Sequence, residues 1–166
     1  MKRICKSHIH HRGFTMIEMV VVLIVMAIVA AFILARATPG SNDLIAQAEI
    51  LKSHLRYAQI RAMNDTVPWG IRIPDAGSYV LYKNNAPPND NILPGEAPGI
   101  SPAPQTHTFK GGVTVTSGVG TTFNFNELGT PIDAGGAPIA SAQTITLSQG
   151  TATSPVTITK NTGYIP

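Results

Sequence analysis

One continuous apolar segment constrains this chain more than any other feature of its sequence. Seventeen uninterrupted apolar residues run from Met19 to Ala35. As a helix, residues 14–35 would span about 33 Å at roughly 1.5 Å per residue, enough to cross the hydrocarbon core of a bilayer. The segment therefore predicts one membrane-spanning helix near the N-terminus, followed by enough chain to form a folded domain.

The distribution of basic residues predicts how this helix is oriented. The chain of 166 residues carries twelve Lys and Arg against nine Asp and Glu, a net charge of +3. Four of the positive charges lie within residues 1–12, so residues 14–166 alone have a net charge of −1. The positive-inside rule then places residues 1–12 in the cytoplasm and the C-terminal domain in the periplasm. A secretory signal is the alternative, but the apolar run is long for one and no convincing cleavage site follows Ala35.

Glu18 does not suit a plain membrane anchor. A charge near the bilayer centre costs roughly 2.5–3.5 kcal/mol, although a carboxylate near the interface can reach the headgroups at a smaller cost. The run Gly13-Phe14-Thr15-Met16-Ile17-Glu18 stands between a short basic leader and the apolar segment. This arrangement resembles the class III signal of type IV prepilins and type II secretion pseudopilins.

The resemblance implies a maturation step and an assembly role. A prepilin peptidase would cut between Gly13 and Phe14 on the cytoplasmic face and methylate the new Phe14 amine. Glu18 would then pair with the amine of a neighbouring subunit, which compensates two desolvated charges and fixes the axial register of a filament. The apolar residues from Met19 to Ile33 would first hold the subunit in the inner membrane and later pack in the filament core.

A second, amphipathic helix is predicted after Thr38-Pro39-Gly40, which interrupts the first helix. Apolar residues then recur at spacings of three and four up to about Met63, as on one face of a helix. The predicted stripe consists of Leu44, Ala48, Leu51, Leu55, Ala58 and Ala62. We expect it to pack against a sheet.

From Val67 onwards the periodicity changes to two, which predicts short antiparallel strands. The expected strands are 69–73, 79–83, 106–110, 113–116, 121–125, 144–147 and 156–159, with Tyr164-Ile165 closing the chain. Trp69 is expected to anchor the core. Residues 84–105 contain six prolines and are expected to form an exposed, extended loop.

The predicted fold class is therefore α+β and pilin-like, with a long N-terminal helix whose second half packs on an antiparallel β-sheet domain. Residues 1–13 form the removable leader, 14–37 the transmembrane and filament-core helix, and 38–166 the amphipathic helix with the β domain.

Three downstream segments narrow the resemblance. They are similar to segments of the GspH/FimT group of minor pilins and pseudopilins. The three segments are Leu55–Ala62, which precedes a Trp-containing strand, Phe123–Pro131 and Ile158–Ile165. This resemblance implies a minor subunit of a type II secretion pseudopilus that takes part in initiation or tip assembly. A FimT- or FimU-like minor pilin of a type IV pilus and a plain single-span envelope protein with a binding domain are the alternatives.

Other chemistry finds little support in the sequence. No nucleotide-binding or hydrolase motif occurs, so no enzyme and no cofactor are expected. A metal site is not expected either, because three of the five histidines lie in the leader and His54 and His107 are far apart in sequence. Some FimT-type proteins bind DNA through arginines near the C-terminus, but no arginine follows Arg72, so no nucleic-acid partner is expected. The expected partners are the prepilin peptidase, other pilins or pseudopilins and the inner membrane.

Overall fold

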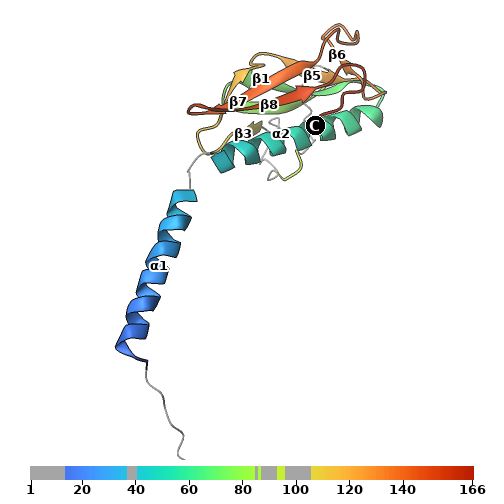
Figure 1. Cartoon of the computed structure of the whole chain (residues 1–166). Helices are drawn as coiled ribbons and strands as arrows, with labels where there is room; N and C mark the ends of the chain where they lie inside the picture. Colours follow the sequence, from blue (N-terminus) through green and yellow to red (C-terminus); the bar gives the residue numbers. More distant parts are fainter. Residues whose placement is uncertain (1–13, 37–40, 85, 87–92, 96–105) are drawn as a thin grey trace, which may run out of the picture. The chain divides into compact units, whose positions relative to one another are not determined.

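The computed structural model describes residues 14–36, 41–84, 86, 93–95 and 106–166. The chain divides into two compact units, Met1–Thr38 and Pro39–Pro166, and each is described by itself (Figure 1). The predicted leader 1–13 and the predicted helix interruption at Thr38-Pro39-Gly40 lie outside the described residues.

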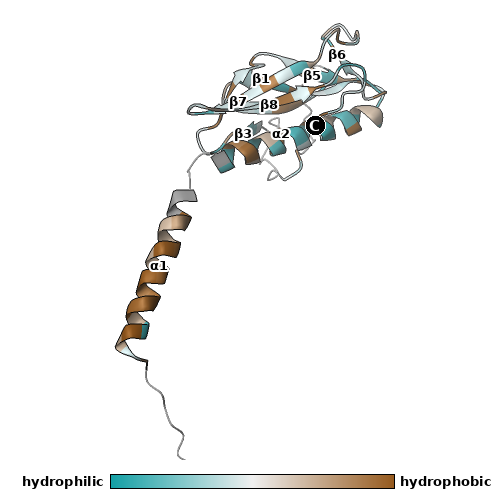
Figure 2. Cartoon of the chain, viewed as in Figure 1, coloured by the Kyte–Doolittle hydropathy of each residue, from teal (hydrophilic) through white to brown (hydrophobic). Residues whose placement is uncertain are grey.

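The first unit consists of helix α1, Met16–Arg36. Its apolar residues cover all sides of the helix rather than one stripe, and Figure 2 shows it coloured as hydrophobic along most of its length. Over Met16–Ile33 it is long and apolar enough to cross a membrane, and none of this stretch is buried inside the described chain. A helix that is hydrophobic all round needs an apolar environment, here lipid or other helices.

The second unit begins with helix α2, Ser41–Met63. The predicted apolar stripe is confirmed, because all six of its side chains are at most 3% exposed. The predicted end of the helix at Met63 is confirmed as well.

Two antiparallel sheets follow α2 and form the predicted antiparallel β domain. The larger sheet has the strand order β3-β2-β1-β5-β6 and the smaller one β4-β7-β8. The strands are β1 Trp69–Asp75, β2 Ser78–Lys83, β3 Thr106–Thr108, β4 Thr114–Ser117, β5 Thr122–Phe125, β6 Pro131–Ile132, β7 Gln143–Gln149 and β8 Ala152–Ile158.

A single hydrophobic core joins α2 to both sheets. The inward row of β1, with Trp69, Ile71 and Ile73, is completely buried, which confirms Trp69 as a core anchor. On the smaller sheet, β7 and β8 contribute Ile145 and Ile158 to the same core. The observed fold is thus the predicted α+β, pilin-like arrangement, with the amphipathic helix packed on antiparallel sheet.

The strands differ from the prediction at three places. Tyr164 and Ile165 form no strand, because Gly163 adopts a left-handed conformation (φ 63°) and turns the tail back, so that the Thr159 N–H donates to the Tyr164 carbonyl oxygen. Strand β6 was not predicted, because it has only two residues, the first a proline, and is too short to show an alternation of apolar and polar side chains. Strand β8 begins before the predicted residue 156, because its polar first half pairs with β7.

Residues 93–95 are the part of the proline-rich segment beyond Ala86 that the structure describes. Pro94 and Gly95 are exposed as predicted, but the prediction of exposure was wrong at Leu93. Leu93 is completely buried in the core and Pro94 follows it at the surface. One apolar side chain therefore anchors this segment, although its composition predicts exposure.

Candidate functional site

The start of α1 holds the two described residues of the predicted processing and assembly site. Phe14 and Thr15 precede the helix, and Glu18 lies in its first turn. The side chains of Phe14 and Glu18 are exposed, and Gly13 lies outside the described residues. The structure therefore places Phe14 and Glu18 close together at one end of a membrane-length helix.

Thr15 and Glu18 cap this helix reciprocally. The backbone N–H of Glu18 donates to Thr15 Oγ1 at 3.3 Å, and the backbone N–H of Thr15 lies 3.5 Å from Glu18 Oε2. This pair is a capping box, in which each side chain satisfies a backbone donor that the helix leaves unpaired. Thr15 was not predicted from the sequence, although the Thr-x-x-Glu spacing is the signal that identifies such a pair.

The capping box determines where the Glu18 charge is held. The carboxylate lies at the positive end of the helix dipole, which stabilises it. Among the described residues, its only protein partner is the backbone amide of Thr15. Thr15 directly follows Phe14 in the chain. The carboxylate thus lies near the backbone N–H of Thr15 and is exposed.

A second polar cluster lies buried between α2 and the larger sheet. His54 Nδ1 is 2.7 Å from the Tyr79 hydroxyl, and His54 Nε2 is 2.8 Å from the carbonyl oxygen of Pro94. Because a carbonyl only accepts, Nε2 carries the proton and Nδ1 accepts from Tyr79. His107 Nε2 lies 2.9 Å from Gln47 Oε1 and its ring stacks on Tyr79, with centroids 4.7 Å apart.

The fold therefore brings together His54 and His107, whose ring centroids are 5.7 Å apart, despite their separation in sequence. Sequence distance was a poor argument against a metal site here. The nitrogens of His54 are both engaged in hydrogen bonds, and no third His, Cys, Asp or Glu joins the pair in the part of the chain described. The cluster fits a structural role, in which buried polar groups satisfy one another.

A charged cluster closes the end of α2. Asp65 accepts a hydrogen bond from the Trp69 indole N–H at 3.0 Å and forms an ion pair with Lys83 at 2.8 Å. The Arg61 guanidinium lies over the Trp69 ring, 4.6 Å from its centroid. The hydrogen bonds from Lys83 and Trp69 lower the pKa of the Asp65 carboxyl from 3.8 to about 2. This cluster fixes the first strand against the helix end.

The three downstream segments of the sequence resemblance meet at Gln59. Its Nε2 donates to the carbonyl oxygens of Gly129 at 2.8 Å and Thr162 at 3.1 Å. One turn earlier, Arg56 Nη2 donates to the carbonyl oxygen of Ile165 at 2.7 Å. The helix, the β5–β6 turn and the C-terminal tail are therefore tied together at one place.

Comparison with known proteins bears on the N-terminal site. Residues 9–34 match the family model of the prokaryotic N-terminal methylation motif. Searches of the curated proteins and of the solved structures gave no significant match to the chain.

The matched motif indicates a type IV pilin-like protein. With the apolar helix α1, it fits a protein anchored in the inner membrane. The motif is consistent with processing by a prepilin peptidase and with assembly alongside other pilins.

Proposed function

We propose that the chain is a minor pilin-like subunit that assembles into a type II secretion pseudopilus and takes part in its initiation or tip assembly. The observation that carries the proposal is the N-terminal methylation motif, with Glu18 held at the start of an otherwise apolar helix. In this proposal the β domain lies in the periplasm, and α1 leaves the inner membrane to pack in the filament core.

Maturation would create the cation that Glu18 lacks. Cleavage between Gly13 and Phe14 would leave a methylated amine on Phe14, a positive charge at the start of the helix. The Glu18 carboxylate already lies beside this position through its contact with the Thr15 amide. Within an apolar filament core, the amine of one subunit and the carboxylate of the next would compensate each other's desolvation and define the axial register.

The finer assignment to the GspH/FimT group rests on three segments of the domain that begins with α2. The three segments that resemble the group lie far apart in sequence, yet the hydrogen bonds of Gln59 join them in one place. A shared structural role would explain why these segments occur together. A FimT- or FimU-like minor pilin of a type IV pilus is the alternative, because the same motif and the same fold serve both filaments.

The proposal assigns the chain no enzymatic activity, cofactor or nucleic-acid partner. The net charge of −1 over residues 14–166, with no arginine after Arg72, argues against a nucleic-acid partner. A plain single-span envelope protein is the competing hypothesis, and the experiment below separates it from a filament subunit.

The test compares Glu18→Ala with Thr15→Val in cells that carry a complete filament-assembly apparatus. Intact mass first establishes that each variant is processed, and immunoblots then measure it in membrane and filament fractions. We expect Glu18→Ala to remain in the membrane and to be lost from filaments. Thr15→Val, which removes the hydroxyl cap but keeps the carboxylate, should still assemble.

Two outcomes would contradict the proposal. Normal assembly of Glu18→Ala would reduce the segment to a membrane anchor. An equal loss of assembly in Thr15→Val would show that helix capping, rather than the charge, explains the effect of Glu18→Ala.

A deletion strain then distinguishes the two filaments: loss of extracellular enzymes indicates secretion, and loss of surface pili indicates a type IV pilus.

A further inference from the structure

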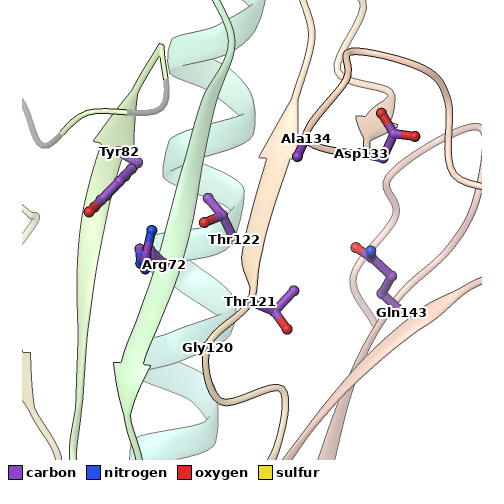
Figure 3. A pocket seen from close by; sticks show the side chains of 8 residues that line it. All are labelled: Arg72, Tyr82, Gly120, Thr121, Thr122, Asp133, Ala134 and Gln143. Carbon is purple, nitrogen blue, oxygen red and sulfur yellow. The ribbon is translucent and has the colours of Figure 1, made fainter.

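Two exposed surfaces of the domain carry charged groups that the proposed function does not use. The first is a pocket of about 540 Å³ on the outer face of the larger sheet (Figure 3). Both Arg72 and Asp133 line it, so its charges favour neither an anion nor a cation as the ligand. The second is the side of α2 that faces away from the core, where the charges follow a symmetric order along the helix.

Four exposed residues define this outward face of α2, and they are Ile45, Glu49, Arg56 and Ile60. Their spacings are four, seven and four residues, so they lie on one side of the helix along about 22 Å. Ile45 and Ile60 are 59% and 57% exposed. An apolar side chain at each end therefore flanks one acidic and one basic residue on the surface of the domain.

Both charged residues of the outward face can contact a partner. Glu49 Oε1 pairs with Lys52 Nζ at 2.9 Å, and the Glu49 side chain is still 58% exposed. Arg56 Nη2 donates to the Ile165 carbonyl oxygen at 2.7 Å, a contact that holds the side chain in place. Because a guanidinium has five N–H donors, Arg56 can bind a carboxylate in addition.

The order of these residues is complementary to itself when two copies of α2 run in opposite directions. In an antiparallel pair centred near Ser53, Ile45 of each copy meets Ile60 of the other. Each Glu49 then meets an Arg56. A parallel pair in register would instead place Glu49 against Glu49 and Arg56 against Arg56, an arrangement that like charges oppose. We propose that the outward face of α2 binds a second copy of this chain in an antiparallel, two-fold symmetric dimer.

The size of the outward face predicts a weak dimer. The face is about 22 Å long and one helix wide, smaller than the ~800 Å² that each partner buries in a stable interface. Because α1 is suited to a membrane, anchored copies meet at a higher effective concentration than copies in solution. The inference rests on α2 alone and does not depend on filament assembly.

The test is disulfide cross-linking of the full chain in membranes of cells that lack a filament-assembly apparatus. Cys5→Ser provides the background, because Cys5 is the only cysteine. Ser53→Cys places a thiol near the two-fold axis, and Thr151→Cys, at the exposed β7–β8 turn, is the matched control for random collision. With copper phenanthroline as the oxidant, we expect Ser53→Cys to give about tenfold more product of twice the chain mass than Thr151→Cys.

Charge reversal tests the pairing itself. Glu49→Arg puts like charges opposite each other at both contacts and should lower the yield of the Ser53→Cys product about tenfold. Glu127→Arg, the same change at an exposed turn residue outside the face, should leave the yield unchanged. Co-expression of Glu49→Arg with Arg56→Glu should restore the product, because every contact between the two variants then joins opposite charges.

Two further measurements keep the result interpretable. The fluorescence of the buried Trp69, the only tryptophan, reports whether each purified variant is folded. Glu49→Gln, which leaves Arg56 intact, should lower the yield less than Glu49→Arg does. The proposal is overturned if Ser53→Cys cross-links no more than Thr151→Cys, if its product contains a different protein, if Glu49→Arg cross-links like the parent, or if the folded charge-reversal pair fails to restore the product.

Discussion

Gln59 and Gly163 meet where the structure leaves no room for a side chain. A Cβ atom on Gly163 would lie 2.6 Å from Gln59 Nε2 and equally close to the Gly129 carbonyl oxygen that Gln59 binds. Gly163 also has a φ of 63°, a conformation that L side chains rarely adopt. The junction of helix, turn and tail therefore requires glycine for two independent reasons.

Gly163→Ala should destabilise the domain more than a matched glycine substitution elsewhere. Gly150 has a similar φ of 60°, but a Cβ atom there would meet nothing within 4 Å. We expect Gly150→Ala to cost about 1 kcal/mol from backbone strain alone. Gly163→Ala should cost a further ~1–3 kcal/mol from overpacking. Urea unfolding followed by Trp69 fluorescence measures both; equal costs would show that the junction tolerates a methyl group.

Leu93 should act as the anchor of the proline-rich segment. Because its side chain is completely buried, Leu93→Ala should lower the free energy of unfolding by about 2–5 kcal/mol. Leu128, which is 76% exposed in the β5–β6 turn, is the matched control, and Leu128→Ala should have almost no effect. Thermal unfolding by circular dichroism measures the difference. A small effect at Leu93 would mean that the segment is not held to the core.

The Tyr79 hydroxyl should contribute to stability through His54. Tyr79→Phe removes a hydrogen bond of 2.7 Å within the buried cluster, and we expect a loss of about 1–3 kcal/mol. Tyr164→Phe removes a hydroxyl from an exposed ring and should be neutral. Urea unfolding of the two variants compares them directly. An equal, negligible effect would show that the His54 contact adds nothing to the fold.

Asp65 should make the domain sensitive to acid. Its pKa is lowered from 3.8 to about 2 in the folded state by Lys83 and Trp69, so its contribution to stability is complete above pH 3.8 and is lost as the pH falls towards 2. Asp65→Asn should flatten this part of the pH profile of stability. Glu127→Gln, at an exposed turn residue, should leave the Asp65-dependent fall in place. An unchanged profile in Asp65→Asn would contradict the assignment.

The sequence alone predicts the helices and the core strands well because their signals are local. The stripe from Leu44 to Ala62 and the alternation around Ile71 each reflect one buried face. The two-residue strand β6 has no such signal, and the turn at Gly163 depends on contacts with Gln59.

In the candidate site, too, only the features with a local sequence signal could be predicted. Phe14 and Glu18 are readable from a motif, whereas the proximity of His54 to His107 and the pocket at Arg72 arise only from strand register and sheet packing.

The most direct test of the central claim is the intact mass of the chain from cells with and without an active prepilin peptidase. We predict a mature species that begins at Phe14 and carries one additional methyl group, present only when the peptidase is active. A chain that retains residues 1–13 in peptidase-positive cells would contradict the account and leave a membrane-anchored β domain.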